Sequence, residues 1–287
     1  MKEDYVARSA QLALLLEVSA YPKPGNVSRT HDFEDTHYEH FLASSVAVYP
    51  VLRAAATGER SVGELVRMGV EESIAWQSGG NTHFGALLLL IPLAMAAGAC
   101  ESTDTEEIKR KAKEIMLNTS VADAVEVYRA FPKAKVKVRR DVPELDVMNE
   151  ASRTEIREKK LSLYDILTIS ASYDSISREL VAGFDKTFQS ARWIRNYAAE
   201  EGINEAIIHA YLWLLSQEED TFVKMKFGTE KSRYVLERAK EIVSRGYKLK
   251  EIEEFDEELI KEGINPGSTA DIIAAALFVA ILGGLRV

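Results

Sequence analysis

The sequence of 287 residues is poor in the features that mark secreted, cysteine-ligated or membrane-spanning proteins. Its single cysteine, Cys100, excludes an internal disulfide and a zinc site built from cysteines. The two longest apolar runs, residues 85–100 and 272–285, are shorter than the roughly 20 residues that span a bilayer, and Pro92 interrupts the first. No basic segment leading into an apolar one opens the chain, so we expect no secretory signal and a cytoplasmic location.

Positive charge is in the minority, because 36 Lys and Arg residues face 45 Asp and Glu residues. The formal net charge of −9 argues against general nucleic-acid binding, although it is compatible with a local basic pocket. With 46% hydrophobic and 28% charged residues the chain can bury a sizeable core, which excludes a disordered protein. We therefore expect small-molecule partners, with neither nucleic acid nor membrane among them.

Apolar residues recur at helical spacing over most of the chain, and prolines and glycines fall where the predicted helices end. No internal repeat, low-complexity segment or Pro/Ser-rich linker marks a boundary. We therefore predict an all-α fold in which residues 1–287 form a single compact multi-helix domain. The predicted helices cover residues 4–20, 38–56 (with a kink at Pro50), 62–77, 86–97, 106–117, 163–170, 176–200, 204–216, 231–244 and 269–282.

One window is strand-like. In residues 133–140, Ala134, Val136 and Val138 alternate with lysines, as they would along a half-buried strand. It is the only such window in the sequence, and we favour an exposed basic loop over a strand.

The first of four polar windows joins the end of the first predicted helix to a stiff turn. Glu17 lies in an otherwise apolar helix, where a buried carboxylate without a partner is costly. Lys23 lies between two prolines and is followed by Gly25, so the backbone holds it in place. Two interpretations stay open: Glu17 pairs with Lys23 to close the turn, or the two groups face a charged ligand.

The second window reads Gly-Gly-Asn-Thr-His-Phe-Gly at residues 79–85 and leads into a helix. Glycines let a ligand approach the backbone, and the free N–H groups of a helix N-terminus favour phosphate. The window is not a Walker A loop, because no Gly-Lys-Ser/Thr follows it. Asn81 and His83 add ligand-binding groups, although His83 taken alone is equally typical of a packed, hydrogen-bonded histidine.

The third and fourth windows also lie at predicted helix ends. The acids at 218–220 precede Lys224, Lys226 and Gly228. Two interpretations stay open: the acids are solvated residues at a helix end, or they bind Mg²⁺ beside lysines that bind phosphate. The sequence Asn-Pro-Gly-Ser-Thr-Ala-Asp at 265–271 is explained by helix capping alone, with Asp271 favoured in the first turn.

Taken together and in this order, the windows resemble the triphosphoribosyl-dephospho-CoA synthase family, which makes the prosthetic-group precursor of citrate lyase and malonate decarboxylase acyl carriers. The resemblance covers nearly the whole chain. It implies an all-helical fold, ATP and 3′-dephospho-CoA as substrates, a divalent cation (Mg²⁺) and adenine as the leaving group. It rests on Leu-Leu-Leu-Glu-Val at 14–18, Pro-Lys-Pro-Gly at 22–25, Gly-Asn-Thr-His at 80–83, Glu-Asp-Thr at 219–221 and Ser-Thr-Ala-Asp at 268–271.

Roles for individual residues follow from this resemblance and from the chemistry of displacing adenine at C1 of the ribose by a 2′-hydroxyl. The transition state resembles an oxocarbenium ion, which calls for a nearby carboxylate and acid/base groups. Glu17 or Asp35 is the candidate base, and Asp220 with Glu219 stabilises charge or binds the metal. The nucleotide-binding set is Lys23, Gly25, Gly80, Asn81, Thr82, His83, Lys224 and Lys226.

The sequence departs from the family pattern in three places. The Gly-Ala-His-x-Asp-Met segment of the family is replaced by a shorter stretch at 31–36, in which only Asp35 falls at the position of the aspartate. Lys-Phe-Gly at 226–228 replaces Arg-Gly-Gly, which weakens bidentate phosphate recognition. The segment 175–184 matches no family element. These departures indicate a divergent branch and leave the acceptor open.

Other functions fit the same residue types. A Mg-dependent nucleotide hydrolase or N-glycosidase would use the same acids with water as acceptor, and a nucleotide-binding scaffold would have no turnover. The pair His31-Asp32 resembles metal-dependent HD phosphohydrolases, but the five histidines are scattered and supply no ligand frame. We expect the apolar last helix, 269–282, to form a dimer face.

Overall fold

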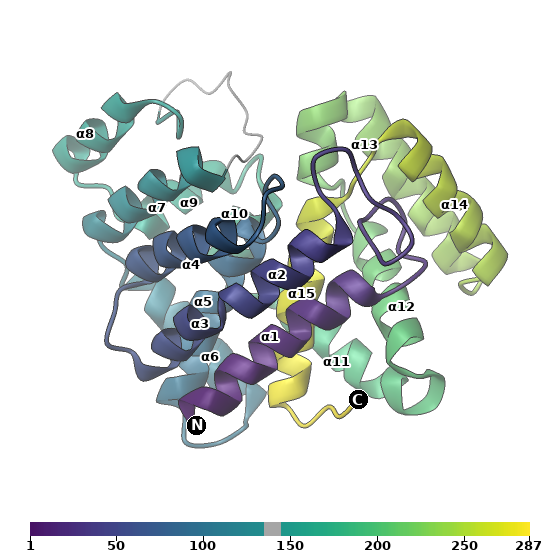
Figure 1. Cartoon of the computed structure of the whole chain (residues 1–287), viewed down its shortest axis with the longest axis horizontal. Helices are drawn as coiled ribbons and strands as arrows, with labels where there is room; N and C mark the ends of the chain where they lie inside the picture. The colour runs from purple at the N-terminus through teal and green to yellow at the C-terminus, as the bar shows by residue number, and fades with distance from the viewer. Residues whose placement is uncertain (135–144) are drawn as a thin grey trace.

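The protein folds into packed helices whose arrangement is shown in Figure 1, a computed structural model that describes residues 1–134 and 145–287. These residues contain helices and no strand, apart from isolated β-bridges at Ser28–His31 and Phe33–Thr36 in the loop after α1. The all-α prediction is confirmed. The helices are α1 (Glu3–Ser19), α2 (Tyr38–Ala47), α3 (Tyr49–Thr57), α4 (Val62–Trp76), α5 (Phe84–Ala99), α6 (Thr105–Leu117), α7 (Val121–Ala134), α8 (Glu150–Lys159), α9 (Leu163–Ser170), α10 (Ser175–Ala182), α11 (Asp185–Glu201), α12 (Ile203–Leu215), α13 (Thr221–Ser244), α14 (Leu249–Glu262) and α15 (Gly267–Leu282).

Two apolar helices, α5 and α15, form the centre of the fold. Apart from Asp271 they carry no charged residue, so they can be buried on every side. α1 and α11 pack on α15, while α3, α4 and α6 pack on α5. One continuous hydrophobic core joins these helices, and α15 runs through the middle of the molecule behind α1 in Figure 1.

The burial of α15 overturns one expectation. Thirteen of its residues are buried within the chain itself, so this helix has no face left for a second copy. The prediction that residues 269–282 form a dimer face is therefore wrong. The reason is that an apolar helix indicates burial without saying which surface covers it.

Some helix ends agree with the capping and proline residues in the sequence. Ser61 accepts a hydrogen bond from the backbone N–H of Glu64 at 3.4 Å, and Asp104 accepts one from Glu106 at 3.0 Å, so these side chains cap α4 and α6 close to the predicted starts at 62 and 106. The predicted helix 38–56 is two helices, because Pro50 lies in the first turn of α3 rather than at a kink.

Other boundaries were missed. The predicted helix 176–200 is interrupted where Gly183 and Phe184 both have positive φ, at 81° and 65°. Three helices were not predicted, namely α7, α8 and α14. In α7 and α8, the mixed charges and Pro132 of α7 obscure the helical spacing of apolar residues. Of the strand-like window, residues 135–140 lie outside the described residues, and Lys133 and Ala134 end α7.

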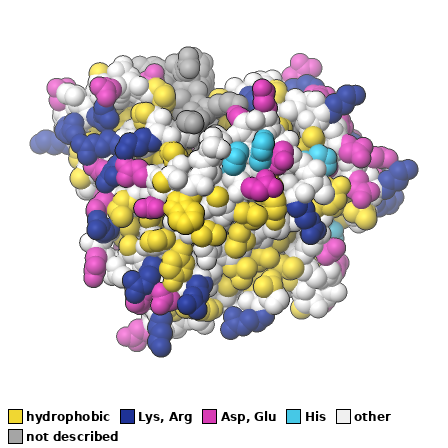
Figure 2. Space-filling view, viewed as in Figure 1, with side chains coloured by type: hydrophobic (Ala, Val, Ile, Leu, Met, Phe, Trp, Pro, Cys, Tyr) yellow, Lys and Arg dark blue, Asp and Glu magenta, His cyan; other side chains and the backbone are white. Residues whose placement is uncertain are grey.

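The surface in Figure 2 mixes charges of both signs around its edge and gathers hydrophobic side chains over its centre. Histidines lie with acidic side chains near its upper part, around the loop before α2. Within residues 1–134 and 145–287, no helix combines the length and the apolar character needed to cross a membrane.

Candidate active site

A cavity of about 960 Å³ lies where several helices begin. The N-terminal ends of α5, α10, α13 and α15 reach it, and the C-terminal end of α1 with the loop that follows completes it. Each helix N-terminus carries a partial positive charge, although side chains already accept from some of its N–H groups, such as those of Ala86, Ser177 and Phe222. Four such ends on one cavity favour an anionic ligand such as a phosphate chain.

The buried pair Glu17–Lys23 lines this cavity. The Lys23 ammonium donates to the Glu17 carboxylate and, at 2.7 Å, to the backbone oxygen of Glu17. Burial raises the pKa of Glu17, while the charge of Lys23 opposes that rise. The interpretation that the two close a turn is confirmed. They also lie on the cavity, so the turn presents its ion pair to the site.

The turn itself is fixed from behind. Tyr211 donates to the backbone oxygen of Pro24 at 2.8 Å, and Asp256 accepts from the backbone N–H of Gly25 at 2.9 Å. Gly25 has a φ of 77°, and a Cβ there would lie 2.4 Å from the backbone oxygen of Ile264. Gly25 is not among the residues that line the cavity, so its part is to shape the turn that carries Lys23.

The second window reaches the cavity through Asn81, Thr82 and His83. His83 Nδ1 is hydrogen-bonded to Ser44 at 2.7 Å, and a chain of hydroxyl contacts continues from Ser44 to Ser73 and Thr82. Burial, with a smaller effect of Lys23, lowers the pKa of His83 to about 3, so its ring is neutral. Its Nε2 is buried and has no hydrogen-bond partner in the part of the chain that the structure describes.

Asp271 is one of the site residues that the sequence did not predict. It lines the cavity from the start of α15, and its Oδ1 accepts from the backbone N–H of Ala86 at 3.0 Å. A Cβ at Gly85 would lie 2.1 Å from Oδ2, so only glycine lets the carboxylate come this close to α5. Burial, then the nearby charge of Glu17, holds the pKa of Asp271 well above its usual range.

Asp220 lies behind the cavity rather than on it. Its Oδ1 accepts from the backbone N–H groups of Phe222 and Val223 at 2.9 and 3.0 Å. Its Oδ2 accepts from the backbone N–H and the hydroxyl of Thr269, both at 2.8 Å. Burial raises its pKa, against these hydrogen bonds. One carboxylate thus ties the start of α13 to the start of α15.

Its neighbour Glu219 does line the cavity. Its carboxylate accepts from Ser232 at 2.6 Å and pairs with Lys224 at 2.9 Å, and these two contacts lower its pKa. Lys224 lines the cavity as well. The third window therefore contributes two acids, Glu218 and Glu219, and one base, Lys224, to the site.

Three further predicted residues lie outside the lining. Asp35 is exposed, and its backbone oxygen accepts from the N–H of Gly80 at 2.7 Å, so both belong to a packed pair of loops. Lys226 is exposed, donates to the backbone oxygen of Gly263 at 3.2 Å and lies 4.8 Å from the ring of Phe227. The cavity therefore takes Lys224, not Lys226, from α13.

The segment 175–184, which matched no family element, contributes to the site through α10. Asp174 caps that helix by accepting from the N–H of Ser177 at 2.7 Å, and it lines the cavity. Arg178, one turn on, also lines the cavity and pairs with Glu218 at 2.7 Å. No sequence motif marks these residues as functional. The sequence pattern predicted one helix over residues 176–200, so the separate start of α10 was not recognised.

Acids outnumber bases on the cavity. Among residues 1–134 and 145–287, five carboxylates face the cavity against three cationic groups, so a polyphosphate bound to these residues needs further positive charge. Oxygen donors of this kind are the ligands that Mg²⁺ prefers. The charged lining residues are Glu17, Asp174, Glu218, Glu219 and Asp271, with Lys23, Arg178 and Lys224.

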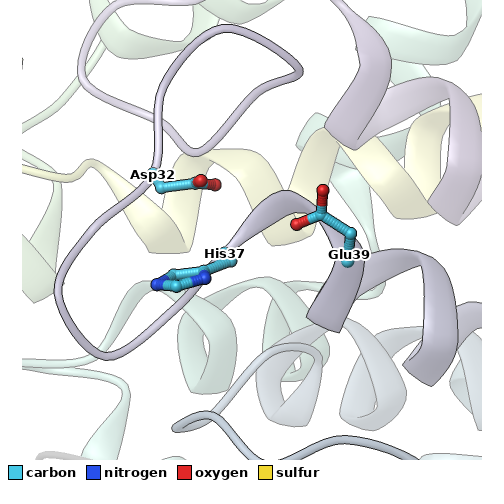
Figure 3. Close-up of side chains that lie close together, drawn as sticks. All are labelled: Asp32, His37 and Glu39. Carbon is cyan, nitrogen blue, oxygen red and sulfur yellow. The ribbon is translucent and has the colours of Figure 1, made fainter.

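A separate group of metal-ligating side chains lies on the surface, outside the cavity lining. Asp32, His37 and Glu39 bring their ligand atoms within 4.8 Å of one another, and all three are exposed (Figure 3). Asp32 already accepts from the backbone N–H of Tyr38 at 2.7 Å, which caps the start of α2. His31 lies elsewhere in the same loop, 3.8 Å from Asp256, and so supplies no HD-type ligand frame with this group.

Comparison with known proteins decides the family. The model of a family described as ATP:dephospho-CoA triphosphoribosyl transferase matches residues 3–286. The chain belongs to this family. The resemblance drawn from the four windows is therefore confirmed.

Relatives in the family are distant but similar along their length. A Malonomonas rubra protein assigned as a 2-(5''-triphosphoribosyl)-3'-dephosphocoenzyme-A synthase is 26% identical over 95% of this chain and 85% of its own length. The Klebsiella pneumoniae protein named as that synthase is 24% identical over 98% of this chain and 91% of its own.

A solved structure supports the fold of the family. It is a crystal structure of an Archaeoglobus fulgidus protein assigned as a triphosphoribosyl-dephospho-CoA synthase. Its TM-score against this chain is 0.72 at 30% identity, covering 87% of this chain and all of the other.

Proposed function

We propose that this chain transfers the triphosphoribosyl group of ATP to the 2′-hydroxyl of 3′-dephospho-CoA and releases adenine. One observation carries the proposal: all four family windows contribute residues to a single cavity, in a chain that the family model matches almost end to end. Glu17 and Lys23, then Asn81 to His83, then Glu219, and finally Ser268 and Asp271 line it.

The triphosphate is proposed to lie against the helix N-termini, with Lys23, Lys224 and Arg178 as its cationic partners. A bound Mg²⁺ would neutralise phosphate charge that these three groups leave uncompensated. The residues that fit it are the lining carboxylates, and Glu219 stays a candidate ligand. Asp220 fits a different part, because its two oxygens already accept four hydrogen bonds that align α13 and α15.

The transfer needs one proton to move from the acceptor to the leaving group. The C1–N9 bond of ATP breaks, the C1–O bond to the acceptor forms, and the proton lost by the hydroxyl balances the one gained by adenine. Asp271 and Glu17 are the proposed bases, since both lie on the cavity and a raised pKa suits proton transfer near neutrality. Asp35, exposed and outside the lining, is the weaker candidate.

His83 is proposed to contact the adenine or the ribose rather than to act as a charged acid. Its ring is neutral, because burial lowers its pKa to about 3, and its Nε2 has no hydrogen-bond partner among residues 1–134 and 145–287. Asn26 adds a second such group, since its Oδ1 is buried without a partner among the described residues while Nδ2 donates to Asn265 at 2.6 Å. Unpaired buried polar atoms are costly, and a bound nucleotide would satisfy both.

The proposal is tested by incubating the protein with ATP, Mg²⁺ and 3′-dephospho-CoA and weighing the products by mass spectrometry. The expected result is free adenine together with an acceptor enlarged by the triphosphoribosyl group. Adenine released equally well without acceptor would indicate an N-glycosidase, and phosphate without adenine would indicate a phosphohydrolase. Saturable ATP binding with no product would indicate a scaffold, and each of these three results contradicts the transferase.

A further inference from the structure

On one side of the cavity, the residues that the structure describes carry no charge. This side, which we call the apolar wall, is formed by α7, α9 and residues 145–147. Six of its eight side chains are buried, and its one polar side-chain atom, the hydroxyl of Tyr128, donates to the backbone oxygen of Leu145 at 2.9 Å. The wall consists of Val127, Tyr128, Phe131, Leu145, Val147, Leu163, Ile166 and Leu167.

The apolar wall begins next to the polar part of the cavity. The ring of Phe131 lies 4.6 Å, centroid to centroid, from the ring of Phe84, which directly follows His83 at the start of α5. Within the described part of the chain, the charged lining residues all come from other elements. These elements are α1 with the loop after it, the start of α10, the segment from the end of α12 into α13, and α15. One ligand that spans the cavity would therefore meet charged groups at one end and aliphatic groups at the other.

Only the adenine ring of ATP could pack on such a surface, and the proposed function places that ring at His83, because the triphosphate and the ribose have no apolar segment. The acceptor matches the wall, since 3′-dephospho-CoA is an adenosine diphosphate that carries a pantetheine arm with methyl and methylene groups. Covering apolar side chains with such a segment removes both from water, which is favourable. Hydroxyls at the junction of α9 and α10, those of Ser170 and Ser172, line the cavity and offer partners for the amides of the arm.

We propose that the apolar wall binds the pantetheine arm of the acceptor and so selects 3′-dephospho-CoA over nucleotides that lack the arm. The adenosine of the acceptor then lies toward Phe84 and His83, where its 2′-hydroxyl can approach the ribose of ATP. This assignment rests on the proposed function. It concerns only which part of the acceptor the wall contacts.

The first experiment compares two acceptors on the unmodified protein at saturating ATP and Mg²⁺. ADP has the same adenosine diphosphate as 3′-dephospho-CoA and no arm. We expect kcat/KM to be at least 100-fold higher for 3′-dephospho-CoA, and pantetheine to inhibit competitively against it. Product from both acceptors with equal efficiency would overturn the assignment of the wall but not the transferase. No product from either would overturn the transferase and with it the assignment.

The second experiment places a larger side chain on the wall. Ile166→Trp fills the space beside α9 without leaving a void, and Leu117→Trp, at an exposed site at the end of α6, is the matched control. We expect Ile166→Trp to raise KM for 3′-dephospho-CoA at least tenfold while KM for ATP and turnover with ADP stay within threefold. An equal change with both acceptors, or no change with either, would contradict the assignment.

The Ile166→Trp variant can be interpreted only if it folds like the unmodified protein, so its folding is measured first. Circular dichroism and thermal unfolding of Ile166→Trp should match those of the Leu117→Trp control. If Ile166→Trp unfolds, pantetheine inhibition of the unmodified protein decides the question. Inhibition competitive with 3′-dephospho-CoA and absent with ADP supports the assignment, and its absence with both acceptors contradicts it.

Discussion

The two sides of the cavity differ in how they are built. The charged side comes from turns and helix ends, where Lys23, His83, Glu219 and Asp271 are held by hydrogen bonds from neighbouring elements. The apolar wall comes from the faces of α7 and α9, whose side chains are held by packing. Buried charged groups position reactive atoms, and their removal from water costs free energy. Packed apolar side chains determine only the shape of the cavity wall. Substitutions on the two sides should therefore fail in different ways.

The largest contrast is expected at Asp271. Asp271→Asn keeps an oxygen that can accept from the N–H of Ala86, so the fold should survive while the proposed base is lost. We expect turnover to fall by about 10²–10⁴-fold, the usual contribution of a general base. Steady-state kinetics with 3′-dephospho-CoA measures this, and turnover within tenfold of the unmodified protein would exclude Asp271 as base.

The ionisation of His83 gives the next test, on stability. Because burial depresses its pKa in the folded state to about 3, folding opposes protonation, and stability is lost as pH falls from about 6.5 toward about 3. At 1.36 kcal/mol per pH unit the loss reaches about 3 kcal/mol at pH 4. Urea unfolding of His83→Gln should show a smaller loss over this window.

The control for this pH series is an exposed histidine. His37→Gln, in the surface loop before α2, should follow the unmodified protein throughout. If His83→Gln and the unmodified protein lose stability in parallel, His83 is not held neutral by the fold.

Asp220→Asn separates alignment of helices from metal binding. An asparagine can still cap α13, but its amide N–H groups would face the N–H and hydroxyl of Thr269, leaving a buried donor unpaired at a cost of about 1–3 kcal/mol. We expect a lower unfolding free energy with an unchanged Mg²⁺ concentration for half-maximal activity. Glu219→Gln is the matched variant, and it should raise that Mg²⁺ concentration. A raised Mg²⁺ requirement in Asp220→Asn would restore Asp220 as a metal ligand.

The smallest effect is expected from salt. Lys224 is exposed, so its attraction for phosphate is screened, whereas Lys23 is buried and is screened much less. Lys224→Ala should raise KM for ATP a few-fold at low ionic strength and hardly at high ionic strength. For Lys23→Met, we expect the change in KM for ATP to be nearly the same at low and at high ionic strength. If that change depended on salt as strongly as in Lys224→Ala, the two lysines would not differ in screening.

Much of the charged side of the cavity could be predicted from the sequence, whereas the apolar wall could not, for a physical reason. Turn formers beside acids, amides and lysines leave a local signal, and Lys23, Asn81, His83 and Glu219 all reach the cavity as predicted. Asp271 was assigned to capping, since proximity to Gly85 is a tertiary contact that no local pattern contains.

The wall depended partly on α7, whose helical period is unclear in the sequence, although α9 was predicted as residues 163–170. The helix α7 was not predicted. In a sequence, an apolar residue such as Val127 gives the same signal whether it packs in the core or lines a cavity. Asp35 and Lys226 show the converse error, because polar residues near a motif are also common on exposed loops. The fold class was simpler to predict, since helical periodicity is repeated in most elements of the chain.

The central position of α5 and α15 has a mechanical consequence. Each is a buried rod that starts at the cavity, and Gly98 near the far end of α5 sits so close to α3 that a Cβ there would lie 2.0 Å from the backbone oxygen of Ala56. Any side chain at that distant crossing would push α5 and α3 apart. The contact at Gly98 thus helps to fix the position of α5, whose other end begins at His83 on the cavity.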